Sequence, residues 1–306
     1  CNMVSKYKHK GLTWIDVEGP TRDEILHLME EYALPELVGE ELLEKSMRGK
    51  VDLYPHFAYL VLHFPIIGRS RDGVRYEQEI DFIVGKEFLI TVHYEPVDPL
   101  HEFSRVFEVK SILDKRPMGD HAGFLLFYIM RELYKYSEAQ LYEIEEDLKE
   151  IEQNIFENKE EKMVRVISNS NRKLLDFKQA IRFHEHVLTS FESAGSHLFG
   201  EKFKHHLESI TGEYRRVECI MASHKEILND LKDTNDALLT SKTNETIKVL
   251  TIISFIMLPL TLITGVFGMN SEIVFISSFR DFLVVLGAMV LTGAVLILYF
   301  RRKRWL

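Results

Sequence analysis

Hydroxyl and amide side chains recur at helical spacing in a part of the chain that holds no charge. No charged residue lies between Lys248 and Glu272, yet a series of polar and small residues that begins upstream continues there at steps of mostly three and four. The series comprises Asp233, Thr240, Asn244, Ile247, Thr251, Ser254, Leu258, Thr261, Gly265 and Gly268. Such spacing keeps side chains on one face of a helix, where a packed coiled coil would favour Leu or Ile. Because polar groups inside a membrane usually line a water-filled path, we interpret this face, called the seam below, as a pore lining.

Two uncharged apolar runs, at residues 249–270 and 282–300, could carry such a path through a bilayer. A hydrocarbon core of about 30 Å requires about 20 apolar residues in a helix. Buried core helices of a soluble protein are the alternative, but they usually run shorter. The sequence therefore predicts two transmembrane helices with a short external loop at residues 271–281.

Basic residues predict the orientation of these helices. Lys242 and Lys248 precede the first apolar run, and a basic cluster follows the second, whereas the connecting loop holds only Arg280. The cluster comprises Arg301, Arg302, Lys303 and Arg304 in a tail at residues 301–306. Because Lys and Arg concentrate on the cytoplasmic side, both termini are expected in the cytoplasm.

The charge is distributed unevenly along the chain. The net charge is −9, and subtracting the +3 carried by the residues after Lys248 leaves −12 on the first 248. An acidic body is not expected to bind nucleic acid, which requires a basic face. The only cysteines, Cys1 and Cys219, cannot build a disulfide framework, which favours a reducing compartment. The first ten residues carry lysines and no apolar run, so no signal peptide is expected.

Residues 1–119 are predicted to form a cytoplasmic α/β domain. Segments rich in Ile, Val, Phe and Tyr predict strands at residues 12–17, 57–64, 79–84 and 88–93. Thr21 and Glu24 form a capping box that begins a helix, a second helix is expected at residues 35–46, and Asp72-Gly73 marks a turn between strands. No Gly-rich phosphate loop and no nucleophile elbow occurs, so the chain is not expected to be an enzyme.

The rest of the cytoplasmic body is predicted to be helical. Antiparallel helices are expected at residues 120–199, one running from a cap at Asp120 towards Asn158 and one from Glu160 to about Glu192. Residues 200–270 contain no proline before Pro259 and predict a stalk helix that continues into the first span. At 1.5 Å per residue, about 65 residues reach on the order of 100 Å. A helix of that length needs partners, and copies of the same chain are the simplest ones.

Several short motifs resemble the CorA family of divalent-cation channels. The first span ends in TGVFGMN at residues 264–270, and the chain ends in RRKRWL. Further similar segments are LPLT (258–261), TNETIKVLT (243–251), WIDVEGP (14–20) and FLITVH (88–93). The resemblance covers essentially the whole chain.

This resemblance implies a homopentameric funnel in the plasma membrane of a prokaryote that takes up Mg²⁺ passively, driven by the membrane potential. Its selectivity filter would comprise Gly268, Met269 and Asn270, with five Asn270 side chains forming the external ring. Neutral amides can hydrogen-bond the hydration shell of Mg²⁺, which dehydrates reluctantly. Met269 is expected to pack, because a thioether is a poor ligand for a hard cation.

The resemblance also implies roles for other seam residues, for Leu250 next to the seam, and for the basic tail. Ile247, Leu250 and Leu258 match an apolar constriction that gates by dewetting. Asn244 and Thr261 match polar positions on either side of it, and Asp233 matches a carboxylate ring. Arg301, Arg302, Lys303 and Arg304 match a basic ring at the cytoplasmic side, a role compatible with simple anchoring.

The family senses its ion through carboxylates between neighbouring cytoplasmic domains. Glu40 and Glu41 fall where one partner would lie. On the stalk the family's aspartate position falls near Glu208, and Glu213 is the other candidate. A regulatory Mg²⁺ is therefore expected between Glu41 and one of these stalk carboxylates.

The external loop departs from the family. It keeps the acidic Glu272, but the usual Met-Pro-Glu-Leu sequence is replaced by the hydrophobic residues 274–276. Mg²⁺ is favoured, while Zn²⁺, Co²⁺ and Ni²⁺ remain open, including a proton-coupled zinc carrier on the same fold. No cofactor is expected, since no nucleotide motif occurs. A membrane-anchored scaffold is the alternative outside transport.

Two other clusters contain side chains that can bind ions. Residues 138–161 are rich in Glu and Asp, which indicates either a solvated helical hairpin or a surface that concentrates cations. The pairs His184/His186 and His205/His206 lack the i, i+4 spacing of a helical metal site and are expected at the surface.

Overall fold

A computed structural model of the chain describes residues 3–65, 68–70, 73–75, 77–112, 119–268, 279–303 and 305. The chain forms two compact units, residues 1–232 and 233–306. Helix α7 (Lys204–Gly268) contributes to both units.

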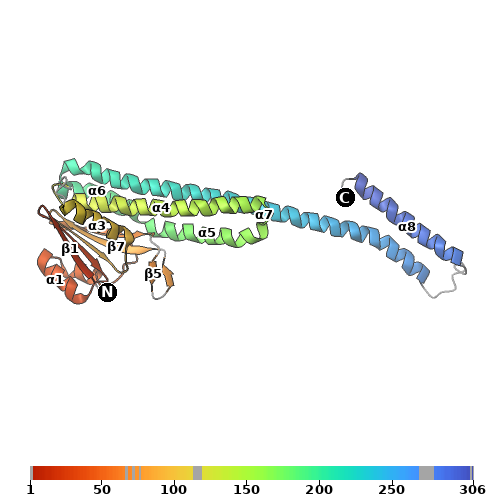
Figure 1. Cartoon of the computed structure of the whole chain (residues 1–306), viewed down its shortest axis with the longest axis horizontal. Helices are drawn as coiled ribbons and strands as arrows, with labels where there is room; N and C mark the ends of the chain where they lie inside the picture. Colours follow the sequence, from red (N-terminus) through yellow and green to blue (C-terminus); the bar gives the residue numbers. More distant parts are fainter. Residues whose placement is uncertain are drawn as a thin grey trace. The chain divides into compact units, whose positions relative to one another are not determined.

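The first unit is built around a six-stranded sheet (Figure 1) with the strand order β1-β2-β8-β7-β4-β3. Strands β2 and β8 run parallel, and the other neighbours run antiparallel. The strands are β1 (Met3–His9), β2 (Leu12–Glu18), β3 (Lys50–Leu53), β4 (Phe57–Phe64), β7 (Gln78–Gly85) and β8 (Phe88–His93). Strands β5 (Gly68–Ser70) and β6 (Gly73–Arg75) form a separate two-stranded sheet.

Helices cover both faces of the larger sheet. Helices α1 (Arg22–Tyr32) and α2 (Glu36–Glu41) bury Ile25 and Val38 against Val61 and Ile90 of the strands. Helix α3 (Asp98–Ile112) packs on the opposite face, where Phe103 and Phe107 contact Trp14 edge to face. With both faces covered, strand β4 reads as the nearly unbroken apolar run FAYLVLHF.

Long helices complete the first unit. Helix α4 (Gly123–Phe156) buries residues at steps of three and four, as an amphipathic helix does: Leu133, Ser137, Leu141, Ile144, Leu148, Ile151 and Ile155. It packs against α5 (Glu160–Ile181), which is followed by α6 (His184–Phe199). A 3₁₀ turn (Glu201–Phe203) leads into α7.

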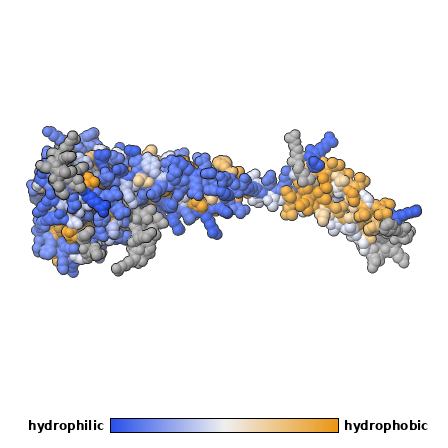
Figure 2. All heavy atoms as spheres, in the orientation of Figure 1, coloured by the Kyte–Doolittle hydropathy of each residue, from blue (hydrophilic) through white to orange (hydrophobic). Residues whose placement is uncertain are grey.

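The second unit contains the last part of α7 and helix α8 (Phe279–Arg302). Figure 2 shows that hydrophobic residues gather over these helices, whereas the first unit presents a mostly hydrophilic surface. Both helices are long and apolar enough to cross a membrane, and only 6% and 0% of their apolar windows are buried within the chain. Core helices of a soluble protein would be mostly buried, so this exposure favours the membrane interpretation over that alternative.

Several predicted elements are confirmed. Strands β4 and β8 have the predicted bounds, and β2 and β7 extend the prediction by one or two residues. Thr21 and Glu24 form the expected capping box, with Thr21 N donating to Glu24 Oε2 at 2.9 Å. Helix α7 spans 65 residues with Pro259 inside it, as expected for the stalk and first span. The predicted turn lies between β5 and β6, and Asp72 itself is outside the described residues.

The prediction of one helix at residues 35–46 was wrong, because α2 ends at Glu41. Beyond it, tertiary partners replace the helical hydrogen bonds. Ser46 N donates to Glu79 Oε1 at 2.9 Å, and the carbonyl oxygen of Glu44 accepts from the Tyr94 hydroxyl at 3.0 Å. A side chain of β7 and one that directly follows β8 thus supply hydrogen-bond partners to the segment after this helix.

Two helix boundaries in the bundle also differ from the prediction. Asp120 does not cap α4, which begins at Gly123 after the N-cap residue Ala122; the Ala122 N–H donates to the Lys86 carbonyl at 2.7 Å. The single helix expected from Glu160 is two helices, since the chain leaves α5 after Ile181 and begins α6 at His184. This break allows His184 to be buried against Tyr134 and His63.

Candidate functional site

The described seam residues lie on an uncovered face of α7. Asn244, Thr261 and Asp233 are exposed, and the apolar side chains of Ile247, Leu250 and Leu258 are exposed by 54%, 63% and 70%. Gly268 is the last residue of α7. Met269, Asn270, Glu272 and Arg304 lie outside the described residues.

Helix α8 contacts α7 outside the seam, and Phe255 at this contact remains 60% exposed. Phe255 contacts Phe300 with ring centroids 6.4 Å apart, and Ile252 is buried. Neither Ile252 nor Phe255 belongs to the seam, since each falls between seam positions along the helix. Within its own unit, α8 therefore leaves the seam without an apolar cover.

The uncovered seam forms a shallow groove of about 790 Å³. Its lining comprises Ser254, Met257, Leu258, Thr261, Leu262, Gly265 and Val266. Gly265 has no atom within 4 Å of the place where a Cβ would lie, so the groove is open beside it. Hydroxyl groups, a glycine and large apolar side chains thus alternate along one surface.

The seam hydroxyls donate back into their own helix. Thr251 donates to the carbonyl oxygen of Ile247 at 2.7 Å, Ser254 to that of Leu250 at 2.9 Å, and Thr261 to that of Met257 at 2.9 Å. This i−4 bond satisfies the hydroxyl hydrogen and leaves the oxygen as an acceptor. Because water bound to a cation presents its hydrogens outward, a row of acceptors can bind a hydrated cation.

Glu41, one of the candidate regulatory carboxylates, lies in an ion pair of the first unit. Lys50 Nζ is 2.6 Å from Glu41 Oε2 and 2.6 Å from Asp52 Oδ2. Partial burial works against the charge on Lys50, but hydrogen bonds to Asp52 and Glu41 prevail and raise its pKa. Glu41 is thus already held by a cation.

Of the other three regulatory candidates, Glu40 and Glu208 are more accessible than Glu41, whereas Glu213 is exposed to the same extent. Glu40 is exposed and lines a groove between α1 and α2. Glu208 Oε2 is 3.8 Å from His205 Nδ1, and Glu213 Oε1 is 3.7 Å from Arg131 Nε. Among the described residues, no group of three or more His, Cys, Asp or Glu side chains is arranged to hold a metal ion.

The basic tail begins within α8. Arg301, Arg302 and Lys303 are exposed, and Lys303 Nζ lies 5.7 Å from the centroid of the Tyr299 ring. Trp305 stacks on Phe300 with centroids 6.0 Å apart. Aromatic side chains next to basic ones are typical of a helix end at a membrane surface.

Several acidic residues of α4 lie in ion pairs. Lys149 contacts Glu145 and Glu146 at 2.9 Å each, Lys173 contacts Asp147 at 2.6 Å, and Arg216 contacts Glu138 at 2.8 Å. These pairs favour a solvated helical surface over a dedicated ion site.

The expectation that all four histidines lie at the surface was wrong for His184. It is buried, accepts from the Tyr134 hydroxyl at Nδ1 (2.8 Å) and lies 2.8 Å from the His63 carbonyl at Nε2. Burial lowers the pKa of His184 to about 3. His206 is half-buried and stacks on Phe203, so it also packs rather than binds ions.

A buried polar cluster at the strand ends was missed by the sequence analysis. His63 of β4 and Glu79 of β7 are register partners, with Nε2 and Oε2 3.5 Å apart. Burial lowers the pKa of His63, but its contact with Glu79 raises it more, so the net shift is upward. Asp81 is fully buried beside Glu79, and burial, followed by the charge of Glu79, raises its pKa. The signal in the sequence was a pair of carboxylates at i and i+2 in a strand.

This chain is similar over nearly its whole length to proteins described as metal-ion transporters. A family model described as "CorA-like Mg2+ transporter protein" matches residues 9–302. The cobalt/magnesium transport protein CorA of Thermotoga maritima is 25% identical over 96% of this chain and 83% of its own length. A putative metal ion transporter of Bacillus subtilis, YfjQ, is 25% identical over 95% of this chain and 89% of its own length.

A solved structure supports the same fold. The complete structure of the CorA magnesium transporter from Methanocaldococcus jannaschii superposes with a TM-score of 0.84. It is 19% identical in sequence and covers 98% of this chain and 93% of its own. The arrangement of an N-terminal α/β unit, a long helix and one further apolar helix is therefore a known fold.

Proposed function

The chain belongs to the CorA family of Mg²⁺ transporter proteins, and from that premise we propose that it is a channel for the passive uptake of Mg²⁺. Members of the family transport ions rather than catalyse reactions, so the chain is not an enzyme. The observation that carries the proposal is the seam: hydroxyl oxygens free to accept hydrogen bonds, on a face of α7 that α8 leaves uncovered.

The pore requires several copies of the chain. One helix cannot enclose a path, and hydroxyl oxygens facing lipid would find no hydrogen-bond donor there. Copies of α7 that turn their seams towards one axis enclose the path, while each α8 lies outside and faces lipid. The family resemblance supports five copies, arranged as a homopentamer.

The external mouth of the proposed pore selects the ion. In the sequence, Met269 and Asn270 follow Gly268, the last residue of α7. Five Asn270 amides would hydrogen-bond the waters of a hydrated Mg²⁺, and Gly268 carbonyls would lie close by. Mg²⁺ usually keeps several of its waters in proteins, so a ring of neutral acceptors holds it without trapping it.

The gate lies deeper, where the seam becomes apolar. Rings of Leu258, Leu250 and Ile247 would exclude water when narrow and admit it when wider. Thr261 and Asn244 supply polar groups on either side of these rings. Asp233 and the basic tail (Arg301, Arg302, Lys303 and Arg304) would supply charge towards the cytoplasm.

The driving force is electrical. With both termini in the cytoplasm, as the basic residues favour, an inside-negative potential draws a divalent cation inward. The energy is about 4.6 kcal/mol per 100 mV, twice the single-charge value. Closure follows when cytoplasmic Mg²⁺ bridges carboxylates of neighbouring subunits, for which Glu40, Glu41, Glu208 and Glu213 are the candidates.

Flux measurements test the proposal. Purified full-length protein in proteoliposomes containing a Mg²⁺-sensitive dye should admit Mg²⁺ when a K⁺ diffusion potential, inside negative, is applied. ATP should not be required, and reversing the potential should slow the uptake. A requirement for ATP, or no flux of any divalent cation, would contradict the proposal.

Transport of Co²⁺, Ni²⁺ or Zn²⁺ is a second candidate, because the loop after Asn270 lacks the family's usual sequence. The Thermotoga maritima relative is named a cobalt/magnesium transport protein. Competition between ions in the same flux assay decides among them. Zn²⁺ uptake that depends on a pH gradient would instead indicate a proton-coupled carrier.

A further inference from the structure

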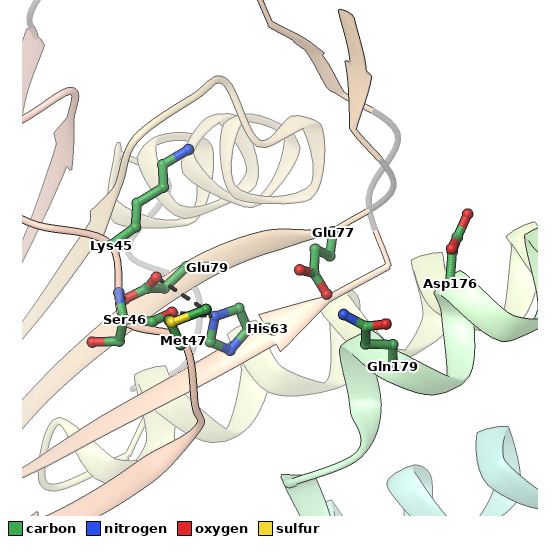
Figure 3. Close-up of a pocket in the computed structure, with 8 residues that line it drawn as sticks. All are labelled: Lys45, Ser46, Met47, His63, Glu77, Glu79, Asp176 and Gln179. Carbon is green, nitrogen blue, oxygen red and sulfur yellow. Dashed lines mark hydrogen bonds and ion pairs between the residues drawn. The ribbon is translucent and has the colours of Figure 1, made fainter. Parts of the chain in front are cut away.

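A pocket of about 500 Å³ lies in the first unit, where the ends of β4 and β7 meet α5. Figure 3 shows its lining, which comes from four parts of the chain. The lining comprises Lys45, Ser46 and Met47 after α2, His63 of β4, Glu77 and Glu79 at the start of β7, and Asp176 and Gln179 of α5. None of these residues belongs to the proposed ion path or to the candidate sensor.

The pocket is predominantly anionic. Glu77, Glu79 and Asp176 supply three carboxylates. Lys45 is the lysine in the lining, and its Nζ is engaged by Glu95 at 3.2 Å and lies 5.3 Å from the Tyr94 ring centroid. A cation is therefore the class of ligand that this lining favours.

Glu79 supplies a second and independent indication of a ligand. Its side chain is only 2% exposed, and Oε1 accepts a hydrogen bond from Ser46 N at 2.9 Å. Oε2 accepts no hydrogen bond from the described residues, and its closest cationic neighbour is His63 Nε2 at 3.5 Å. A buried carboxylate oxygen without a donor is costly, which points to a bound group that satisfies it.

Asp81 is a second buried carboxyl group with oxygens that lack a hydrogen-bond donor in the described part of the chain. It follows Glu79 on the same face of β7, has no exposed surface, and neither of its carboxylate oxygens has a hydrogen-bond partner among the described residues. Burial and the charge of Glu79 raise the pKa of Asp81, so a cation beside Glu79 would favour the ionised form of both carboxyl groups. A divalent ion would neutralise much of this charge.

The size of the pocket and its donor set favour a hydrated ion over a directly coordinated one. A zinc-type site requires about four converging ligands, and the described residues provide no cluster of even three. Mg²⁺ is usually held by one or two carboxylates with several waters retained. At about 30 Å³ per water, an ion with six waters fills less than half of the pocket.

We propose that this pocket binds a hydrated divalent cation, Mg²⁺ under cellular conditions, within a single subunit. Glu79 Oε2 anchors the ion, and Glu77 and Asp176 accept hydrogen bonds from its waters. The ion thereby joins β7, α5 and the segment after α2. This site differs from the inter-subunit sensor and does not depend on the proposed transport.

Amide hydrogen exchange of the purified full-length protein tests the site. Adding millimolar Mg²⁺ should slow exchange severalfold in peptides that cover residues 42–53 and 77–85. Glu79→Gln and Asp176→Asn should each remove this protection. Glu152→Gln, at an exposed position of α4, is the matched control and should retain it.

The variants separate this site from the sensor and from misfolding. Asp176 lies on the surface helix α5, so Asp176→Asn should fold even if Glu79→Gln does not. Glu41→Gln with Glu208→Gln should leave protection of the pocket peptides unchanged. Equal protection in wild type and Asp176→Asn, or no protection in wild type, would overturn the proposal.

Discussion

The hydroxyl of Thr261 donates its hydrogen to the carbonyl oxygen of Met257 at 2.9 Å, one turn earlier in α7. The same i−4 bond occurs at Thr251 and Ser254, also on the seam. Each side chain is thereby held along the helix, with its oxygen still able to accept a hydrogen bond. The pattern converts three flexible hydroxyls into a row of fixed acceptors.

Replacing Thr261 by Val should reduce Mg²⁺ flux about five- to tenfold, because each subunit loses one acceptor worth about 1 kcal/mol for the waters of the ion. Thr261→Ser should retain most of the flux, since it keeps the oxygen. The control is Thr292→Val on α8, where the same i−4 bond to Ala288 lies away from the seam. Equal losses at Thr261 and Thr292 would show that shape, not the acceptor, matters.

Asn270→Ala should abolish or greatly reduce Mg²⁺ flux while the oligomer stays assembled. The reason is loss of the proposed amide ring at the external mouth. Met269→Leu should retain flux, since Met269 is expected to pack. Size-exclusion chromatography with light scattering reports assembly, and the dye assay reports flux. Unchanged flux and ion discrimination in Asn270→Ala would exclude the ring.

A polar side chain in the apolar constriction should make the pore leak. Leu258 is 70% exposed within the chain and lines the seam groove. Leu258→Ser should raise flux at inhibitory internal Mg²⁺ concentrations, because a wetted ring no longer blocks the path by dewetting. Val295→Ser, at an exposed position of α8, should have little effect on flux. If both variants close as wild type does, Leu258 is not part of the gate.

The sequence predicted those elements whose signals are local. Strands β4 and β8 are unbroken apolar runs between turns, so their bounds followed directly. The edge strands β1 and β3 were missed, because their alternate residues are polar and partly exposed. The ends of α2 and α5 were also missed, since Glu79, Tyr94 and His63 supply the hydrogen-bond partners there from elsewhere in the fold.

Local sequence signals likewise predicted only part of the candidate site. The seam could be predicted because helical spacing fixes which residues of α7 share a face. The sequence could not predict the Glu41–Lys50 ion pair or the pocket shared by Glu79 and Asp176. These sites depend on the sheet and α5, which bring together residues that are distant in sequence. Sequence patterns reveal a functional surface on one element more readily than a site between elements.

The first unit should lose stability as pH falls below about 6.5, partly through His184. Burial lowers the pKa of His184 to about 3 from an ordinary value of 6.5, and the groups facing it are His63, Tyr134 and Tyr214. Between these pH values the unfolded state binds a proton that the folded state does not, so stability falls as pH falls. The loss should amount to a few kcal/mol, at about 1.4 kcal/mol per pKa unit.

Urea unfolding of the full-length protein, followed by Trp14 fluorescence, measures this pH dependence. His184→Gln should be less stable at pH 7 but show a shallower slope between pH 6.5 and 5. His205→Gln, at an exposed position, should keep the slope of the wild type. Parallel slopes in wild type and His184→Gln would mean that other groups account for the acid lability.

The Glu41–Lys50 pair gives the sensor hypothesis two predictions of opposite sign. Glu41→Gln combined with Glu208→Gln should weaken inhibition by internal Mg²⁺, because the bridging ion loses carboxylates on both sides of the subunit interface. Lys50→Met should strengthen inhibition of flux by internal Mg²⁺. Lys50 Nζ forms an ion pair with Glu41 Oε2 at 2.6 Å and therefore competes with the ion for this carboxylate. An exposed or half-exposed pair is worth up to about 1 kcal/mol, so the apparent affinity of the sensor for Mg²⁺ should rise about two- to fivefold.

A ligand shifts the closed state only by its differential affinity, and several such sites acting together supply the difference. Protease protection of the first unit by Mg²⁺ should follow the same order, highest in Lys50→Met and lowest in the double variant. If all three proteins respond to Mg²⁺ alike, Glu41 is not part of the sensor, while the proposed pore remains intact.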